Sequence, residues 1–391
     1  MRKSLDFFHS GKGMMRPKLN TLLLLVFLLL VYGLLMMTSA SVEIAKSQYG
    51  DAFYFFKRQG IFALVGLLVL FITLHIPIIL WKKYSWVLLL GSFLLLILVL
   101  VPGVGKVVNG SARWIDLGFF RLQPSELAKI FIVIYLAAYL DENLKEVKQT
   151  WTGFMKPIFI IAAAAFLLQL EPDHGALVIL MLTSFCMIFL AGAQIYRFLP
   201  MFVGCAGVVT YLAMTKSYVI ERFSSFLNPW AAENVFDSSY QLTQALIAFG
   251  RGEWFGVGLG NSIQKLYFLP EAHNDFVLAI VGEELGLIGV SVVLILFCLL
   301  IFTAFSTGKI AEKNSCLFQA FLAYGIGLLF SGQALINIGV NIGLLPTKGL
   351  TLPFMSYGGA SLIICCFMAA LLIRIQYETQ FPEGRIESIR G

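Results

Sequence analysis

Ten apolar runs constrain the fold of this 391-residue chain more than any other feature. A helix needs about 20 apolar residues to cross a bilayer, because each residue adds about 1.5 Å along its axis. The runs cover 20–40, 61–80, 85–102, 124–140, 155–170, 174–192, 196–214, 275–305, 315–340 and 356–376. We therefore expect an all-α polytopic membrane protein with about ten transmembrane helices.

The composition agrees with lipid as the main solvent. Hydrophobic residues make up 59% of the chain and charged residues 13%, against about 45–50% and 25% in soluble domains. Five of the six cysteines lie inside apolar runs, and the four histidines show no metal-ligand spacing. These patterns exclude a set of soluble domains, and we expect neither a disulfide framework nor a zinc site.

Five basic residues precede the first apolar run: Arg2, Lys3, Lys12, Arg16 and Lys18. A basic flank beside a span is typical of the cytoplasmic side, so we prefer topology to nucleic-acid binding as its explanation. A cleavable signal peptide is disfavoured, because the apolar run exceeds the usual length of about 7–15 residues. With an even number of spans, both termini would be cytoplasmic. We expect tails at 1–19 and 377–391 around one transmembrane domain, 20–376.

Three polar segments then face outward. They are 103–123, 341–357 and a large extracytoplasmic loop, 215–275, between the seventh and eighth helices. Non-helical backbone at membrane depth is tolerated where it lines a cavity. We therefore expect three irregular segments to meet around a polar cavity on the outer face.

The first segment and the helix after it carry several candidate site residues. Glu126 and Lys129 are three residues apart and share a helix face. They form either a structural ion pair or part of a polar cavity. Trp114, beside Arg113, is either an interfacial aromatic residue or a platform for a sugar. The short turn Glu171-Pro-Asp-His174 could bind a metal, but a solvated turn is the better interpretation.

The segment around Asp275 is the most informative. The glycine-rich stretch GVGLGN follows no strand and lacks the lysine of a phosphate loop, so a nucleotide site is not expected. Asp275 opens an apolar helix, where an aspartate can serve as a simple N-cap. Glu283 and Glu284 follow in that helix and cannot both face lipid, because adjacent side chains point about 100° apart. This excess of acids favours a functional role for Asp275.

Lys348 stands in a rigid outward loop between Pro346 and Pro353. A lone lysine in such a loop is either solvated or bound to an anionic ligand such as a phosphate. Both interpretations stay open at this point.

Five motifs in chain order resemble the SEDS family of bacterial cell-wall polymerases, and its cell-division branch more than its elongation branch. They are GSARWIDLG, RLQPSELAKI, QALIAFGRGEWFGVGLGNS, LPEAHNDFVLAIVGEELGLIG and NIGLLPTKGLTLPFMSYGG. The resemblance extends from the first span to the last. It implies a ten-helix fold and a peptidoglycan glycosyltransferase that uses lipid II. It further implies a class B penicillin-binding protein and other division proteins as partners, in the bacterial inner membrane at the septum.

The resemblance also implies roles for individual residues. Asp275 matches the catalytic aspartate of the family, and Trp114 matches a tryptophan tied to activity. Asn274 departs from the threonine that is common in the division branch. It is polar and neighbours the catalytic position, so we expect little effect.

Glycan extension from lipid II transfers a sugar from a diphosphate to a hydroxyl group. The site then needs one base and positive charge for the departing diphosphate. Asp275 is the expected base, although a helix N-terminus would keep it ionised and make it a weak one. The candidate cations are Arg113, Lys129, Arg251 and Lys348, helped by a divalent ion such as Mg or Mn. The other expected substrate contacts are Trp114, Gln123, Glu126, Lys265, Glu271 and Ser356.

Three alternatives remain open. A lipid II flippase would use the same polar residues for transport without chemistry. An elongation-type polymerase would perform the same reaction in another process. A scaffold would only recruit partners. No covalently bound cofactor is expected in any of these.

Overall fold

The structure is a computed structural model that describes residues 17–108, 111–116, 118, 121–200, 203, 228–231, 239–346 and 349–380. Most of these residues are helical. The long helices are α2 (Pro17–Tyr49), α3 (Tyr54–His75), α5 (Ser85–Leu100), α6 (Pro124–Glu142), α8 (Trp151–Leu170), α9 (His174–Leu190), α12 (Tyr240–Gly252), α13 (Val277–Lys313), α14 (Leu317–Asn341) and α15 (Gly359–Gln380). The short elements are α4 (Ile78–Lys83), α7 (Leu144–Gln149), η1 (Ile195–Arg197) and a π-helical turn, η2 (Gln264–Phe268).

Nine of the ten predicted spans coincide with long helices, and the remaining one, 196–214, lies mostly outside the described residues. Among the residues that the structure describes, six helices are long and apolar enough to cross a membrane, namely α2, α3, α8, α13, α14 and α15. Helices α5 and α9 are shorter apolar helices. The predicted helical, multi-pass fold is confirmed.

Two of the three outward segments are more ordered than predicted. The segment 103–123 forms an antiparallel sheet of β1 (Gly105–Val108), β2 (Ser111–Asp116) and β3 (Arg121–Leu122), in that order. The large loop contains α12 and η2. The expectation of irregular backbone was wrong there, because backbone groups near a membrane find partners in strands and helices.

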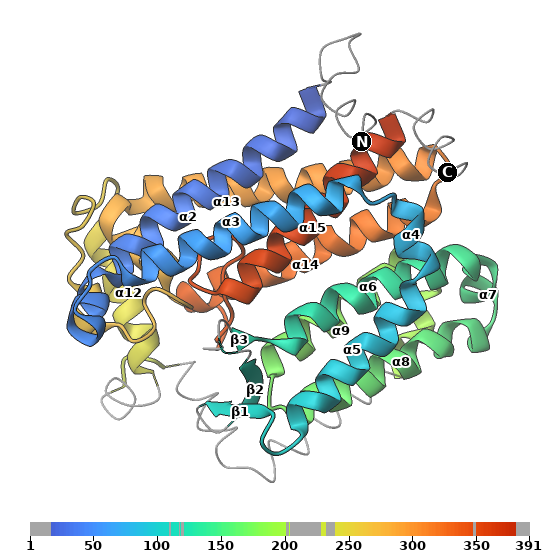
Figure 1. The fold of residues 1–391 in the computed structure, drawn as a ribbon, viewed down its shortest axis with the longest axis horizontal. Coiled ribbons are helices and arrows are strands. Elements are labelled where there is room, and N and C mark those ends of the chain that lie inside the picture. The colour runs from blue at the N-terminus through green and yellow to red at the C-terminus, as the bar shows by residue number, and fades with distance from the viewer. Residues whose placement is uncertain are drawn as a thin grey trace.

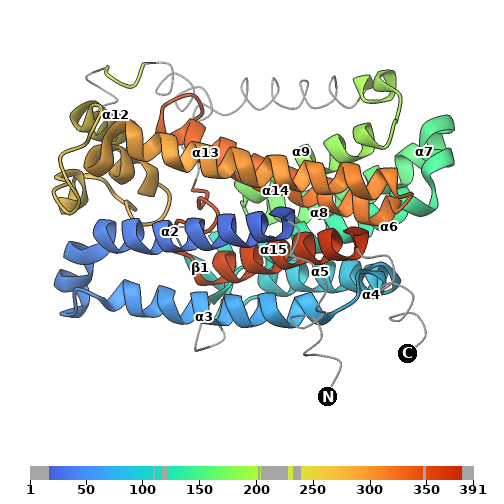
Figure 2. The same cartoon turned by 90° about the horizontal axis from the view of Figure 1, so that it is seen from above.

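Helix α15 occupies the centre of the bundle (Figures 1 and 2). Its most apolar window is 83% buried, against 33–44% for α2, α3 and α13. It packs against α3, α2, α13, α14 and α6. The outer helices expose many large apolar side chains, as expected where lipid is the solvent.

The two ends of the bundle differ. The first residues of α2 and the last of α15 lie at one end, together with α4 and α7, whereas α12 and the sheet lie toward the opposite end (Figure 1). This agrees with the prediction that both termini are on one side. We call the end with α12 and the sheet the outer end, following the basic N-terminal flank.

Helix α13 is interrupted near its outer end. Gly286 has φ 66° and ψ −162°, so the helical ladder breaks there. The carbonyls of Glu283 and Glu284 accept hydrogen bonds from the N–H groups of Val257 and Gly258, at 2.9 and 3.0 Å. The loop after α12 therefore supplies the partners that the broken helix lacks.

Candidate active site

Asp275 lies in a tight turn directly before α13. Glu271 begins this turn with a φ of 55°, and its carbonyl accepts hydrogen bonds from the N–H groups of Asn274, Asp275 and Phe276 at 3.0–3.4 Å. Phe276 is the N-cap of α13, and the helix begins at Val277. The alternative that Asp275 is merely a helix cap is therefore wrong.

The carboxylate of Asp275 accepts no hydrogen bond and forms no ion pair with any residue that the structure describes. Burial raises its pKa to about 7, and the negative charge of Glu271 adds to the effect. We expected a weak base held ionised by the helix, so this finding corrects the expectation. Desolvation outweighs the helix dipole because the carboxylate sits in a turn outside the helical ladder.

The loop after α14 packs against this turn. A Cβ atom placed on Gly349 would lie 2.8 Å from Oδ2 of Asp275, so the two residues are in close contact. Leu350, the next residue, packs on Gly175 at the start of α9. Since consecutive Cα atoms are about 3.8 Å apart, this short stretch connects Asp275 to the α8–α9 turn.

His273 and Ser356 stabilise the outer end of the bundle around Asp275, which we call the mouth. The ring of His273 contacts those of Phe55 and Tyr357, with centroids 4.7 and 5.8 Å away. Burial lowers its pKa, so the ring is neutral at pH 7. Ser356 Oγ accepts a hydrogen bond from the Leu352 N–H at 2.8 Å. Both side chains thus hold the loop in place, and a substrate contact of Ser356 stays a prediction.

Two exposed arginines near this mouth were missed from the sequence. Burial raises the pKa of Tyr357, and the positive charges of Arg58 and Arg121 oppose that shift. Arg58 follows the aromatic cluster at the start of α3, and Arg121 belongs to β3. Arg58 lies outside the motifs noted in the sequence, whereas Arg121 opens the motif RLQPSELAKI but was not among the candidate site residues.

A second polar cluster surrounds the α8–α9 turn. Arg113 donates to the backbone carbonyls of Glu171 and Pro172. Asp173 caps α9 and accepts hydrogen bonds from Ser125 Oγ at 2.7 Å and Gln123 Nε2 at 3.1 Å. This cluster fixes the sheet and α6 to the turn, and Trp114 lies beside it on β2, opposite Lys106.

The turn was expected to be solvated, and that interpretation was wrong. Glu171 is 0% exposed and Asp173 4%. Neither carboxylate oxygen of Glu171 has a hydrogen-bond partner among the described residues. Burial raises the Glu171 pKa to about 8, the charge of Asp173 adds to it, and Arg113 opposes it.

Glu126 and Lys129 form a closed pair inside the bundle. Nζ of Lys129 lies 2.7 Å from Oε1 of Glu126, and both side chains are less than 10% exposed. Gln333 of α14 donates to the other carboxylate oxygen at 3.4 Å. Of the two interpretations left open, the structural ion pair fits these contacts.

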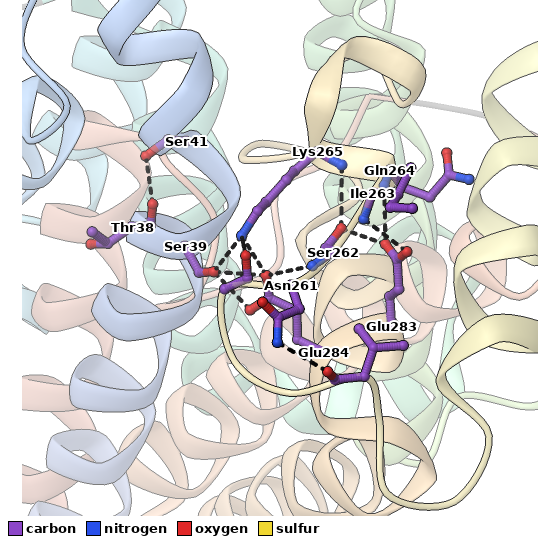
Figure 3. A network of polar contacts seen from close by, with 12 residues as sticks. Thr38, Ser39, Ser41, Asn261, Ser262, Ile263, Gln264, Lys265, Glu283 and Glu284 are labelled. Carbon is purple, nitrogen blue, oxygen red and sulfur yellow. Dashed lines mark hydrogen bonds and ion pairs between the residues drawn. The ribbon is translucent and has the colours of Figure 1, made fainter.

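Glu283 and Glu284 form a buried charge network (Figure 3). Both are 0% exposed. Glu283 pairs with Arg251 at 3.0 Å, and Glu284 pairs with Lys265 at 2.7 Å. Ser39 Oγ also donates to the carboxylate of Glu284. The carboxylate of Glu283 accepts further hydrogen bonds from the Ser262 hydroxyl and from the backbone N–H groups of Ile263 and Gln264. The network ties α2, the loop after α12 and α13 together.

The predicted site residues therefore separate into two kinds. Asp275 and Glu271 lie together at the mouth of α13, with Gly349 and the Ser356 turn beside them. The charges of Arg113, Lys129, Arg251 and Lys265 are engaged by backbone carbonyls or carboxylates. Lys348 lies outside the described residues. Substrate binding by these side chains stays a prediction.

No group of three or more His, Cys, Asp or Glu side chains that could hold a metal ion occurs in the described part of the chain. The predicted divalent ion thus has no protein ligand cluster there. Asp275 and Glu271 are the acids nearest to the proposed chemistry, and they would offer at most two carboxylates to an ion.

Comparison with known proteins identifies a family and relatives that this chain resembles. A family model described as cell cycle protein, FtsW/RodA/SpoVE, matches residues 20–381. A Pseudomonas fluorescens (strain SBW25) protein named "Probable peptidoglycan glycosyltransferase FtsW" is 50% identical over 359 residues, covering 92% of this chain and 88% of that protein. A protein of the same name from Escherichia coli O6:H1 is 46% identical over 366 residues, covering 94% and 87%.

Two solved structures share the fold. A chain from a peptidoglycan synthase complex that coordinates polymerization and crosslinking matches with a TM-score of 0.76 and 26% identity, covering 92% of this chain and 97% of that one. The rod shape determining protein RodA of Thermus thermophilus matches with a TM-score of 0.66 and 24% identity, covering 91% and 96%. The RodA likeness concerns the fold alone. On the family match and these relatives, the chain belongs to the FtsW/RodA/SpoVE family.

Proposed function

We propose that this protein is a peptidoglycan glycosyltransferase that polymerises lipid II into glycan strands and releases undecaprenyl diphosphate. The observation that carries the proposal is the carboxylate of Asp275, which has no partner among the described residues and lies half-buried at the outer end of the bundle with a pKa raised to about 7. The names of the relatives point to the same reaction.

The chemistry requires one base. A sugar hydroxyl of one lipid II attacks the anomeric carbon of the growing chain, a new C–O bond forms, and the bond to the diphosphate breaks. Asp275 accepts the proton of the attacking hydroxyl. A diphosphate leaves without a proton, so no acid partner is needed. A base with a pKa near the working pH is deprotonated in a large fraction of molecules and still binds a proton strongly. The raised pKa therefore suits Asp275 to this role.

Positive charge must meet the departing diphosphate. Lys348 directly precedes Gly349, which touches Asp275, and so it is our first candidate. Arg58 and Arg121 are exposed, and their positive charges oppose the rise in the pKa of Tyr357 at the same end of the bundle. A divalent ion, magnesium or manganese, would be held mainly by the diphosphate oxygens, because the described residues supply no ligand cluster.

The cellular setting is part of the proposal. We place the protein in the bacterial inner membrane at the division septum, with a class B penicillin-binding protein and other division proteins as partners. The related synthase complex unites polymerization with crosslinking, which supports a crosslinking partner here. The relatives named FtsW favour division over an elongation role.

The test is an assay of the purified protein with labelled lipid II, with and without its penicillin-binding partner. We expect glycan strands from the wild type and none from Asp275→Ala, with both proteins folded. Normal polymer from the Asp275→Ala variant would contradict the assignment. Lipid II movement across vesicles without chain growth would favour a flippase, and no activity with intact partner binding would favour a scaffold.

A further inference from the structure

The backbone carbonyl of Asp275 has unusual partners. It lies just outside the helical ladder of α13, whose first carbonyl, that of Phe276, accepts from Ala279 at 3.0 Å. Two side-chain amides of α14 bond to it instead, Asn337 Nδ2 at 2.9 Å and Asn341 Nδ2 at 2.9 Å. These asparagines are 1% and 0% exposed, near the end of α14. Buried amides are costly without partners, so their presence calls for a reason.

Asn337 also reaches the loop that covers Asp275. The same Nδ2 atom donates to the carbonyl of Leu350 at 2.6 Å. One amide group therefore joins the Asp275 turn to the chain directly after Gly349. Asn341 completes the arrangement, because its Oδ1 accepts the N–H of Ala279 at 3.2 Å and its amide donates to the Asn337 carbonyl at 2.9 Å.

Gly349 is fixed by this link against the carboxylate. A Cβ there would lie 2.8 Å from Oδ2 and 3.7 Å from Cγ of Asp275. The first distance is too short for real atoms, so a side chain at 349 must shift either the carboxylate or the loop away from their present positions. The constraint that the structure shows at this position is the space beside the carboxylate.

We propose that Asn337, Asn341 and Gly349 are positioning residues for Asp275: the amides fix its backbone and the covering loop, and Gly349 leaves room for its carboxylate to face the substrate. This rests on the proposed role of Asp275 as the base. The three residues do not touch the reacting atoms and act through Asp275. Their contribution is geometric, and misplacement of a catalytic group by about 1 Å can cost about 100-fold in rate.

The first experiment measures kcat and KM for lipid II with the purified full chain and its partner, comparing Gly349→Ala with Gly358→Ala. Gly358 lies nine residues further along the same loop, and a Cβ there would make only ordinary contacts, at 3.5 Å or more. We expect Gly349→Ala to lower kcat at least tenfold, with KM changed less than about threefold, and Gly358→Ala to match the wild type. Wild-type kcat in folded Gly349→Ala would overturn the role of Gly349.

The second experiment compares Asn337→Leu with Asn337→Asp. Both remove the donated hydrogen bonds at similar size, and only the second adds a negative charge close to Asp275. Glu271 and His273 are the titratable neighbours in the same turn. We expect both variants to lower kcat at least tenfold per folded molecule. Asn337→Asp should also move the acid limb of the rate–pH profile upward by at least half a unit.

A purely structural role would give a different result. Less folded protein would be recovered, but the folded fraction would keep the wild-type kcat and acid limb, and this would overturn the proposal. Asp275→Asn runs beside these variants. An active Asp275→Asn would refute the proposed function itself, whereas an inactive Asp275→Asn with normal Gly349→Ala and Asn337→Leu would refute only the positioning.

Discussion

Two acidic regions lie eight residues apart around the start of α13, and the protein treats them in opposite ways. Glu283 and Glu284 are fully buried, and each has a cationic partner and additional donors. Asp275 is half-buried, and its carboxylate has no partner among the described residues. The comparison indicates that the paired acids hold the fold together, whereas no described residue neutralises Asp275, which suits the role of base that we propose for it.

The physical basis of the difference is desolvation. A buried carboxylate is tolerated as an anion when charges and hydrogen bonds replace its water. Where they are missing, the pKa rises, as it does for Asp275. A raised pKa costs stability, so it makes Asp275 a candidate for function; Glu171 shows the same shift, and the close contact of Asp275 with the loop at Gly349 distinguishes the two acids.

The largest effect on stability is expected from Lys265→Met. The Lys265 side chain is 7% exposed, and its loss leaves the buried charge of Glu284 without a cation. We expect a loss of about 3–5 kcal/mol in unfolding free energy, measured by thermal and denaturant unfolding in detergent. The double variant Lys265→Met/Glu284→Gln should recover more than half of it. Equal stability of the single and double variants would show that the unpaired charge of Glu284 is not the cause of the loss.

Glu171→Gln should stabilise the protein, and only at higher pH. The folded pKa of Glu171 is raised from 4.5 to about 8, so folding disfavours its charged form. Wild-type stability therefore falls as pH rises from about 4.5 to 8, and Gln removes that fall. We expect a gain of about 2 kcal/mol at pH 8, below the full linkage value because water relaxes part of the penalty. No gain is expected at pH 4.5, and a pH-independent difference would contradict this account.

The polymerisation rate should depend on the ionisation of Asp275. With a pKa near 7, the free carboxylate fraction falls about tenfold between pH 8 and pH 6. Initial rates with labelled lipid II at saturating concentration should fall by a similar factor. The protein should stay folded across that range, as checked by tryptophan fluorescence. A flat profile would place the base elsewhere.

Arg251→Ala should have the smallest effect. The Arg251 side chain is 38% exposed, so solvent screens much of its attraction to Glu283. Glu283 also keeps hydrogen bonds from Ile263 N–H at 3.0 Å and Gln264 N–H at 3.2 Å. We expect a loss of about 1 kcal/mol in the same unfolding assay. A loss as large as that for Lys265→Met would show that the exposure of the cation does not determine how much each ion pair contributes to stability.

The bundle was predictable from the sequence because apolar runs of sufficient length have few alternatives in lipid. An excess of acids at a helix start favoured a functional role for Asp275, and the family resemblance implied that the role is catalytic. The states of its neighbours were not predictable, because pairing depends on residues far away in the chain. Lys265 reaches Glu284 and Ser39, and Arg113 reaches the carbonyls after α8. From the sequence alone, the side chains of Lys265 and Arg113 had no assigned partner within the protein.

The positioning asparagines left a weak signal. Asn337 and Asn341 are four residues apart on an apolar helix and so share one face. This spacing predicts a common partner but cannot identify the carbonyl of Asp275. The close approach of Gly349 left no signal, because only the packed loop reveals the missing space.

The most direct test of the central claim is Asp275→Asn, measured for stability and for polymer in the same preparation. The account predicts an unfolding temperature equal to or above that of the wild type, because a poorly solvated charge is removed. It also predicts a fall in glycan synthesis of at least about 100-fold. A variant that polymerises lipid II within a few-fold of the wild type, or that loses activity only because it unfolds, would contradict the claim that Asp275 is the unpaired base.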